Sequence, residues 1–130
     1  MKIREVLQTA KIVGRLGYEL EENSSAVVFI NLAYRRLAME AKPMALLSNT
    51  ANVSDKPLVW LDKCNFIKTP PAIQETDLDN NSDVLLDDCL FDAFVYAILT
   101  TANPENESFL KQYTYYKNLY RESVFNDGLR

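Results

Sequence analysis

Apolar residues recur every three or four positions in four stretches of the chain, the spacing that gathers them on one face of an α-helix. In the second stretch Val27, Ile30 and Tyr34 follow this spacing, while Arg35 and Glu40 fall on the polar side. The third stretch is apolar on nearly every side, so we expect it at the buried centre of the fold. The pattern predicts helices at residues 3–18, 26–41, 85–101 and 104–124.

Capping residues mark the ends of two of these helices. The run Asn23-Ser24-Ser25 supplies an N-cap for the second helix. Pro43 ends that helix, because the residue before a proline is disfavoured in helical geometry. The run Asn103-Pro104-Glu105 combines an asparagine cap, a proline at the first helical position and an acidic residue near the positive end of the helix dipole. We therefore expect the fourth helix to begin at Pro104.

The middle of the chain, residues 44–73, has a different pattern. Short apolar runs alternate with asparagine, serine, threonine and proline, which is typical of strands and turns. The runs 58–61 and 65–68 predict two strands, and a third strand is expected within 45–53. Two consecutive prolines end the section, since proline cannot donate to a sheet ladder.

Together these elements predict a mainly α fold. It is a four-helix bundle-like domain with a small β-hairpin or three-stranded ribbon inserted between the second and third helices. We expect Trp60 and Phe66 to pin the ribbon to the helices. The length of 130 residues suits one domain, residues 1–130, with 125–130 as a short C-terminal tail.

Composition narrows the possible functions. Fourteen basic and eighteen acidic residues give a net charge of −4, whereas a general nucleic-acid binder is usually basic. The chain has no histidine, which excludes Ser-His and Cys-His nucleophile pairs and histidine proton shuttles. Cys64 and Cys89 form no Cys-x-x-Cys motif. The longest apolar run, residues 93–99, is far shorter than the roughly 20 residues that a membrane-spanning helix needs.

The acidic stretch 77–88 carries oxygen-bearing side chains at a spacing similar to that of a calcium-binding loop. These residues are Asp77, Asp79, Asn81, Asp83 and Asp88. Ser82 replaces the glycine that such a loop needs at its sixth place, and an aspartate replaces the closing glutamate. The pattern therefore favours a solvated acidic loop over a metal site, and we expect no metal and no cofactor.

Asp87, Asp88 and Asp92 would gather at the start of the third helix, where a pair of carboxylates could act as general acid and base. Attraction to the positive end of the helix dipole explains Asp87 and Asp88 without any chemistry. We expect no catalytic residues, and therefore no enzyme.

Two features suggest contacts with other subunits. Tyr115 lies on the opposite side of the fourth helix from its aromatic stripe, so it is a candidate anchor for a neighbouring subunit. The basic residues of the first helix contrast with the acidic middle of the chain. Lys11 and Arg15 are therefore candidates for a head-to-tail contact between copies with complementary charge. A solvated basic face is the simpler alternative for these two residues.

The order of the elements resembles that of the head-to-tail connector proteins of tailed bacteriophages, also called adaptor or head-completion proteins. Four runs carry the resemblance: Phe29–Ala38, Val84–Ala97, Asn103–Glu105 and Phe109–Tyr113. It implies a non-enzymatic virion protein, assembled in the host cytoplasm and without membrane contact. It also implies a ring of about twelve copies that joins the portal protein to the tail or to a second adaptor. Genomic DNA would pass through this ring without sequence-specific binding.

The resemblance also implies positions for the contacts. Phe125, Leu129 and Arg130 would dock on the portal. The acidic residues Asp77, Asp79 and Asp83 would face the channel or a neighbour. Two other functions remain open at this point. One is a small acidic assembly or regulatory module that binds a single protein partner, and the other is a calcium-binding protein that uses residues 77–88.

Overall fold

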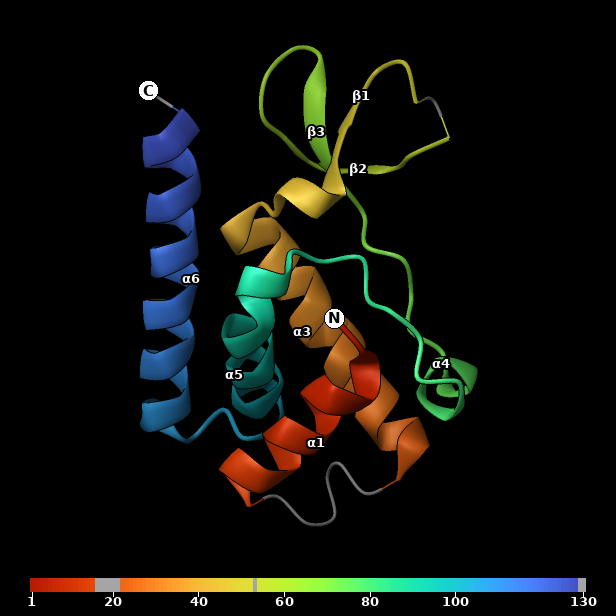
Figure 1. Ribbon diagram of the computed structural model, residues 1–130, viewed down its shortest axis with the longest axis vertical. Coiled ribbons are helices and arrows are strands. Elements are labelled where there is room, and N and C mark those ends of the chain that lie inside the picture. The colour runs from red at the N-terminus through yellow and green to blue at the C-terminus, as the bar shows by residue number, and fades with distance from the viewer. Residues whose placement is uncertain (16–21, 53, 129–130) are drawn as a thin grey trace.

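The computed structural model of the chain describes residues 1–15, 22–52 and 54–128, with side chains as far as Val124. In the chain a small sheet is inserted between α3 and α4, and in space it lies at one end of the group of helices (Figure 1). The α-helices are α1 (Ile3–Gly14), α3 (Asn23–Ala41), α4 (Glu75–Asp79), α5 (Phe91–Ala102) and α6 (Glu107–Gly128). The strands are β1 (Leu47–Asn49), β2 (Pro57–Trp60) and β3 (Asn65–Lys68). The prediction of a mainly α domain with a β-rich insertion is confirmed.

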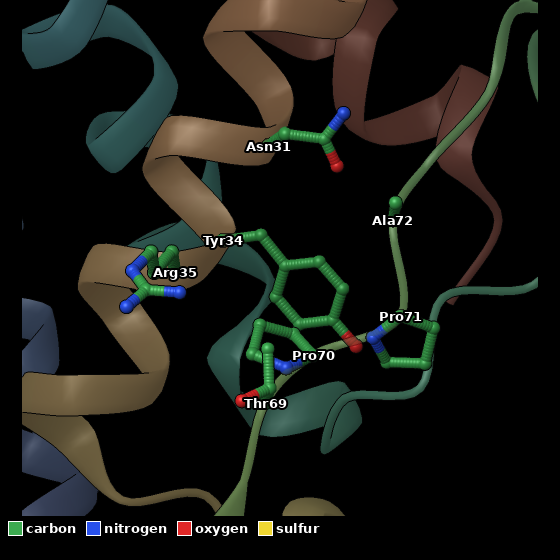
Figure 2. A pocket seen from close by; sticks show the side chains of 7 residues that line it. All are labelled: Asn31, Tyr34, Arg35, Thr69, Pro70, Pro71 and Ala72. Carbon is green, nitrogen blue, oxygen red and sulfur yellow. The ribbon is translucent and has the colours of Figure 1, made fainter. Parts of the chain in front are cut away.

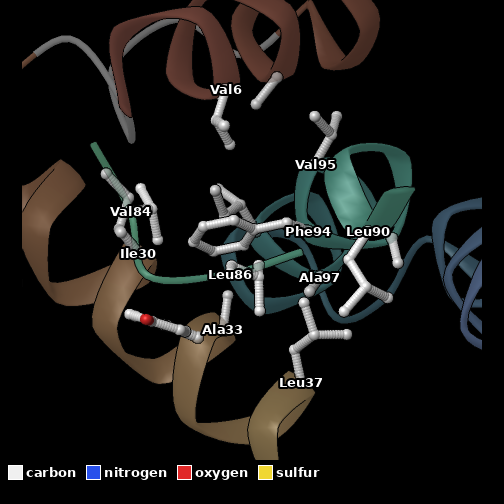
Figure 3. Close-up of a cluster of buried hydrophobic side chains, with 14 of the residues drawn as sticks. Val6, Ile30, Ala33, Leu37, Val84, Leu86, Leu90, Phe94, Val95 and Ala97 are labelled. Carbon is white, nitrogen blue, oxygen red and sulfur yellow. The ribbon is translucent and has the colours of Figure 1, made fainter. Parts of the chain in front are cut away.

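Helix α5 is the centre of the helical body and packs against α1, α3 and α6. The Phe94 ring on α5 is fully buried, and its centroid lies 5.6 Å from that of Tyr34 on α3. Figure 3 shows the ring in the middle of the cluster, with Val6 of α1 on one side and Ala33 of α3 on the other. The central position predicted for the third helix is confirmed.

The predicted start of that helix is wrong, because α5 begins at Phe91 and not at residue 85. Just before it, the chain is paired with the N-terminus. The Ile3 amide donates to the Ser82 carbonyl, and the Val84 amide donates to the Met1 carbonyl, each over about 3 Å. This pairing holds residues 82–84 extended, and a short 3₁₀ turn at Asp88–Leu90 leads into α5.

Helix α6 also differs from the prediction. It begins at Glu107, and Asn106 caps it by accepting a hydrogen bond from the Phe109 amide at 3.2 Å. Residues 103–106 form a turn that precedes the helix. At its other end α6 runs on to Gly128, so most of the predicted tail, residues 125–130, is helical.

The first two helices match their predictions closely. Helix α1 ends at Gly14, and Arg15 follows in the left-handed conformation, with φ of 50°. Residues 16–18 of the predicted first helix lie outside the described residues. The N-cap predicted at Asn23–Ser25 is wrong, because α3 already begins at Asn23 with Glu22 as its N-cap, and the Glu22 carbonyl accepts from the Ala26 amide at 2.9 Å. Helix α3 ends at Ala41, as predicted.

The insertion is a three-stranded antiparallel sheet in the order β1-β3-β2. Strand β3 has its predicted bounds, β1 lies within its predicted stretch, and β2 begins and ends one residue earlier than predicted. Residue 53 of the stretch predicted for β1 lies outside the described residues. In the register, Phe66 of β3 lies opposite Ser48 of β1 and Trp60 of β2. The Asp62 carboxylate closes the turn between β2 and β3 by accepting from the amides of Cys64 and Asn65, each at 2.8 Å.

The role predicted for Trp60 is wrong. Its ring covers the buried Phe66 ring at a centroid distance of 4.9 Å, and 54% of Trp60 stays exposed. Ile67, on the other face of β3, is fully buried and joins the helical core instead. Alternation along the strand places Phe66 and Ile67 on opposite faces, so only Ile67 can reach the helices.

Candidate interaction surfaces

A half-buried polar cluster joins α3 to α6. Glu40 accepts a hydrogen bond from the Tyr113 hydroxyl at 2.8 Å and one from the Lys117 ammonium at 3.1 Å. Its second oxygen pairs with Arg36 at 3.2 Å. Burial alone would raise the pKa of Glu40, but the hydrogen bonds from Tyr113 and Lys117 outweigh it and lower the pKa. Glu40 is therefore ionised and serves the packing of the two helices.

A second cluster joins the start of the insertion to α6. The Tyr120 hydroxyl donates to Asp87 and accepts from the Met44 amide at 2.9 Å. The other Asp87 oxygen accepts from the Ala45 amide at 2.7 Å. Burial, followed by the bond to Asp87, raises the pKa of Tyr120.

These contacts correct the interpretation of the carboxylates before α5. Asp87 is not held by the dipole of α5, because the helix begins only at Phe91, and both of its oxygens bind groups of the fold. Asp88 is 88% exposed in its side chain and pairs with the N-terminal ammonium of Met1 at 2.9 Å. The two carboxylates bind different parts of the fold.

The acidic stretch 77–88 is bound to the start of α1. The Asp77 carboxylate caps α4 by accepting from the Gln74 amide at 2.7 Å. Asp83 pairs with Lys2 at 3.2 Å. The Arg4 guanidinium donates to the carbonyls of Leu78, at 2.8 Å, and Asp79, at 2.6 Å, at the end of α4.

This arrangement corrects the expectation of a simple solvated loop, since the stretch begins with the end of α4 and is fixed to α1. Within the described residues no group of three or more cysteine, aspartate or glutamate side chains is arranged to hold a metal ion. The side chains of Asp79 and Asp83 are exposed and that of Asp77 is half-buried. Their expected role at a channel or a neighbouring subunit stays a prediction.

Lys11 lies in the last turn of α1, and Arg15 is the residue that follows the helix. Lys11 lines a cleft of about 190 Å³ between α1 and α4, together with Arg4 and Asp79. Arg15 is exposed just beyond the end of α1. Lys2 and Arg4, at the N-terminal end of α1, already bind the acidic stretch of their own chain. A contact between copies would therefore use the C-terminal end of α1. The intersubunit role of Lys11 and Arg15 stays a prediction.

Tyr115 is 57% exposed, in line with its position opposite the aromatic stripe of α6. Its ring contacts Tyr116 edge-on at a centroid distance of 5.2 Å, and Tyr116 stacks on Tyr96 of α5 at 5.7 Å. The Tyr115 ring is thus held in place by its contact with Tyr116, as an anchor residue requires. Its binding partner stays a prediction.

The sequence analysis missed an apolar surface on α3. Val28, Leu32 and Met39 are each about half exposed, with Arg35 between the last two. Beside this surface lies a cleft of about 270 Å³, shown in Figure 2. Residues of α3 and of the segment before α4 line it: Asn31, Tyr34, Arg35, Thr69, Pro70, Pro71 and Ala72. The signal was present in the sequence, because positions 28, 32 and 39 share one helical face.

The cleft is fixed by contacts between α3 and the segment 69–73. The Asn31 side chain accepts from the Ile73 amide at 2.8 Å and donates to the Ile73 carbonyl at 2.9 Å. The Tyr34 hydroxyl donates to the Leu85 carbonyl. Burial raises the pKa of Tyr34.

The residues expected to dock on a portal lie at the end of the chain. Phe125 belongs to the last turns of α6, and its side chain is not among those described. Leu129 and Arg130 lie outside the described residues. Their docking role stays a prediction.

Comparison with protein-family models, with curated proteins and with solved structures finds no match to this chain. Among the residues that the structure describes, no helix is long and apolar enough to cross a membrane.

Proposed function

We propose that this chain is a non-enzymatic structural subunit that self-associates, and that it acts as a head-to-tail connector in a tailed-bacteriophage particle. The observation that carries the proposal is the outward apolar surface of α3 and α6. Val28 and Leu32 on α3 and Tyr115 and Leu119 on α6 are each about half exposed, although the chain has a complete core beneath them. Apolar side chains gathered on one helix face are typical of protein–protein contacts.

The polar groups of the fold support the non-enzymatic part of the proposal. The carboxylates of Asp87 and Glu40 each accept hydrogen bonds from groups of the fold. The fold therefore accounts for both carboxylates without assigning them a reaction. The resemblance in element order to phage connectors supplies the particular role.

In the proposed ring, the portal protein and the tail or a second adaptor would bind the two ends. DNA would pass through the centre without sequence-specific contacts. The net charge of −4 per subunit favours this role, because an acidic lumen repels the phosphate backbone. Exposed Asp79 and Asp83 are the candidates to face that lumen.

The experiment is co-expression with the portal protein encoded by the same genome, followed by purification through the portal and light scattering. We expect the chain to remain bound and to form a ring with a central channel in electron micrographs. A chain that stays monomeric and has no affinity for the portal would contradict the proposal. That result would favour the small module that binds one other protein.

A further inference from the structure

The outer face of α3 presents a row of exposed side chains. Val28 is 55% exposed and Leu32 is 54% exposed, and Arg35 follows one turn later. These three residues, at positions i, i+4 and i+7, lie on one side of the helix. We refer to Val28, Leu32 and Arg35 as the α3 ridge.

The outer face of α6 has a row of the same spacing. Tyr115 and Leu119 are exposed, and Glu122 follows them, again at positions i, i+4 and i+7. The opposite side of the helix carries the buried Tyr113 and Tyr120, so this row points away from the core. Tyr115, Leu119 and Glu122 are the α6 ridge. Helix α6 stands at one edge of the molecule (Figure 1), where a neighbour can reach it.

The two ridges are complementary. In each ridge two apolar residues are followed, in the direction of the chain, by one charged residue. Each ridge spans about 10 Å at a rise of 1.5 Å per residue. The charges are opposite, since α3 ends its row with Arg35 and α6 with Glu122. Both residues are exposed, and among the described side chains neither belongs to an ion pair.

We propose that the α3 ridge of one copy binds the α6 ridge of a second copy, with the two helices parallel. Leu119 then packs against Leu32, Tyr115 covers Val28, and Glu122 pairs with Arg35. Parallel helices with this side-chain spacing pack at an axis separation of about 8–10 Å. The inference deepens the proposed function, on which it rests, by naming the surfaces that join the copies.

This contact is head to tail, because each copy uses a different surface on each side. A copy that is bound through its α3 ridge still has its α6 ridge unoccupied, so it can bind a further copy. Such a contact closes into a ring when the rotation between neighbours divides a full turn, and otherwise continues as a filament.

The test is a charge-reversal cycle on the full chain. The variants are Arg35→Glu, Glu122→Arg and the two together, with Lys63→Glu and Glu105→Arg as matched reversals at exposed positions outside both ridges. Sedimentation velocity up to about 1 mM gives the dissociation constant of each variant. Circular dichroism verifies that each variant is folded.

We expect each single reversal to weaken self-association by about tenfold or more, because it places like charges opposite each other. The double variant regains the wild-type dissociation constant to within about threefold, since the pair is restored with its signs exchanged. The two control reversals leave the constant within the same range of the wild type.

Three results would overturn the inference. They are a wild-type chain that stays monomeric up to about 1 mM, single reversals that behave like the controls, and a double variant that associates more weakly than either single variant.

The proposed function is tested by a separate measurement, the binding of the chain to the portal. Portal-bound rings formed equally well by Arg35→Glu and Glu122→Arg would leave the connector role in place and reject this interface, whereas loss of portal binding by the wild type would reject the role itself.

Discussion

The helical body and the β-insertion, residues 44–73, are built on the same chain but are held in different ways. In the body, Phe94, Ile98 and Leu99 of α5 are fully buried among the apolar faces of the surrounding helices. The insertion contributes few side chains to this core, among them Leu46 and Ile67. Its ends are instead fixed by hydrogen bonds that the amides of Met44, Ala45 and Ile73 donate to side chains of the helical body.

This difference implies that apolar burial in the helical body sets the stability of the protein, whereas hydrogen bonds set the position of the insertion. Apolar burial is summed over many contacts and sets most of the free energy of unfolding. A hydrogen bond contributes less, but it fixes one atom against another and is lost when a single group is removed. We therefore expect substitutions in the body to affect global stability most, and substitutions at the attachment points to affect the insertion first.

The largest effect is expected from Phe94→Ala. Loss of this central ring leaves a cavity between α1, α3 and α5, and the free energy of unfolding should fall by about 3–5 kcal/mol. Chemical denaturation measures it. A loss below about 1 kcal/mol would mean that α5 is not the centre of the core. Trp60→Ala, which removes a half-exposed ring from the insertion, is the comparison and should cost clearly less.

A smaller effect is expected from Asp87→Ala. This variant leaves the Ala45 amide and the Tyr120 hydroxyl without their acceptor, which should cost about 1–3 kcal/mol. Hydrogen exchange should accelerate first at Met44 and Ala45. The control is Asp88→Ala at the neighbouring exposed position, where the cost should stay within about 0.5 kcal/mol. Equal costs for the two variants would contradict the role given to Asp87.

A pH-dependent effect is expected at Glu40. Its pKa is lowered from 4.5 in the folded protein, so its contribution to stability is present above pH 4.5 and is lost as the pH falls through the folded value. Glu40→Gln should remove this part of the acid dependence while keeping the side-chain volume. Unfolding free energies of the two proteins, measured from pH 7 down to acid, should therefore converge as the pH falls. Parallel curves would be the contrary result.

The smallest effect on folding is expected from Lys11→Glu combined with Arg15→Glu. Both residues are near the surface of α1, so melting should change little. Assembly should weaken if this part of α1 meets a neighbour. Lys63→Glu, on the turn of the insertion, is the control for a change of charge alone. Unchanged assembly at ordinary salt would reject complementary charge on α1.

The sequence predicted what local spacing determines and missed what distant contacts determine. The repeat of apolar residues located α3 and the central α5, and the punctuated pattern of residues 44–73 located all three strands. The start of α5 was misplaced because residues 82–84 pair with the N-terminus, a contact across some eighty residues. No helical pattern contains that information.

The same limit applies to the candidate surfaces. The exposure of Tyr115 follows from its place opposite the stripe of α6, so the sequence predicted it. The α3 ridge was missed because α3 has apolar residues on both sides, and Val28 and Leu32 look like further core positions until the packing is known. Asp87 was assigned to a helix dipole because its partner, Tyr120, lies in another helix 33 residues away.

The central claim, that this chain is a structural subunit that joins its own copies on a portal, is tested most directly by the mass of the portal-bound complex. Native mass spectrometry counts the copies of the chain for each portal oligomer. The account predicts a closed ring of about twelve copies on each portal oligomer. A single copy bound to the whole portal oligomer, or none, would contradict it.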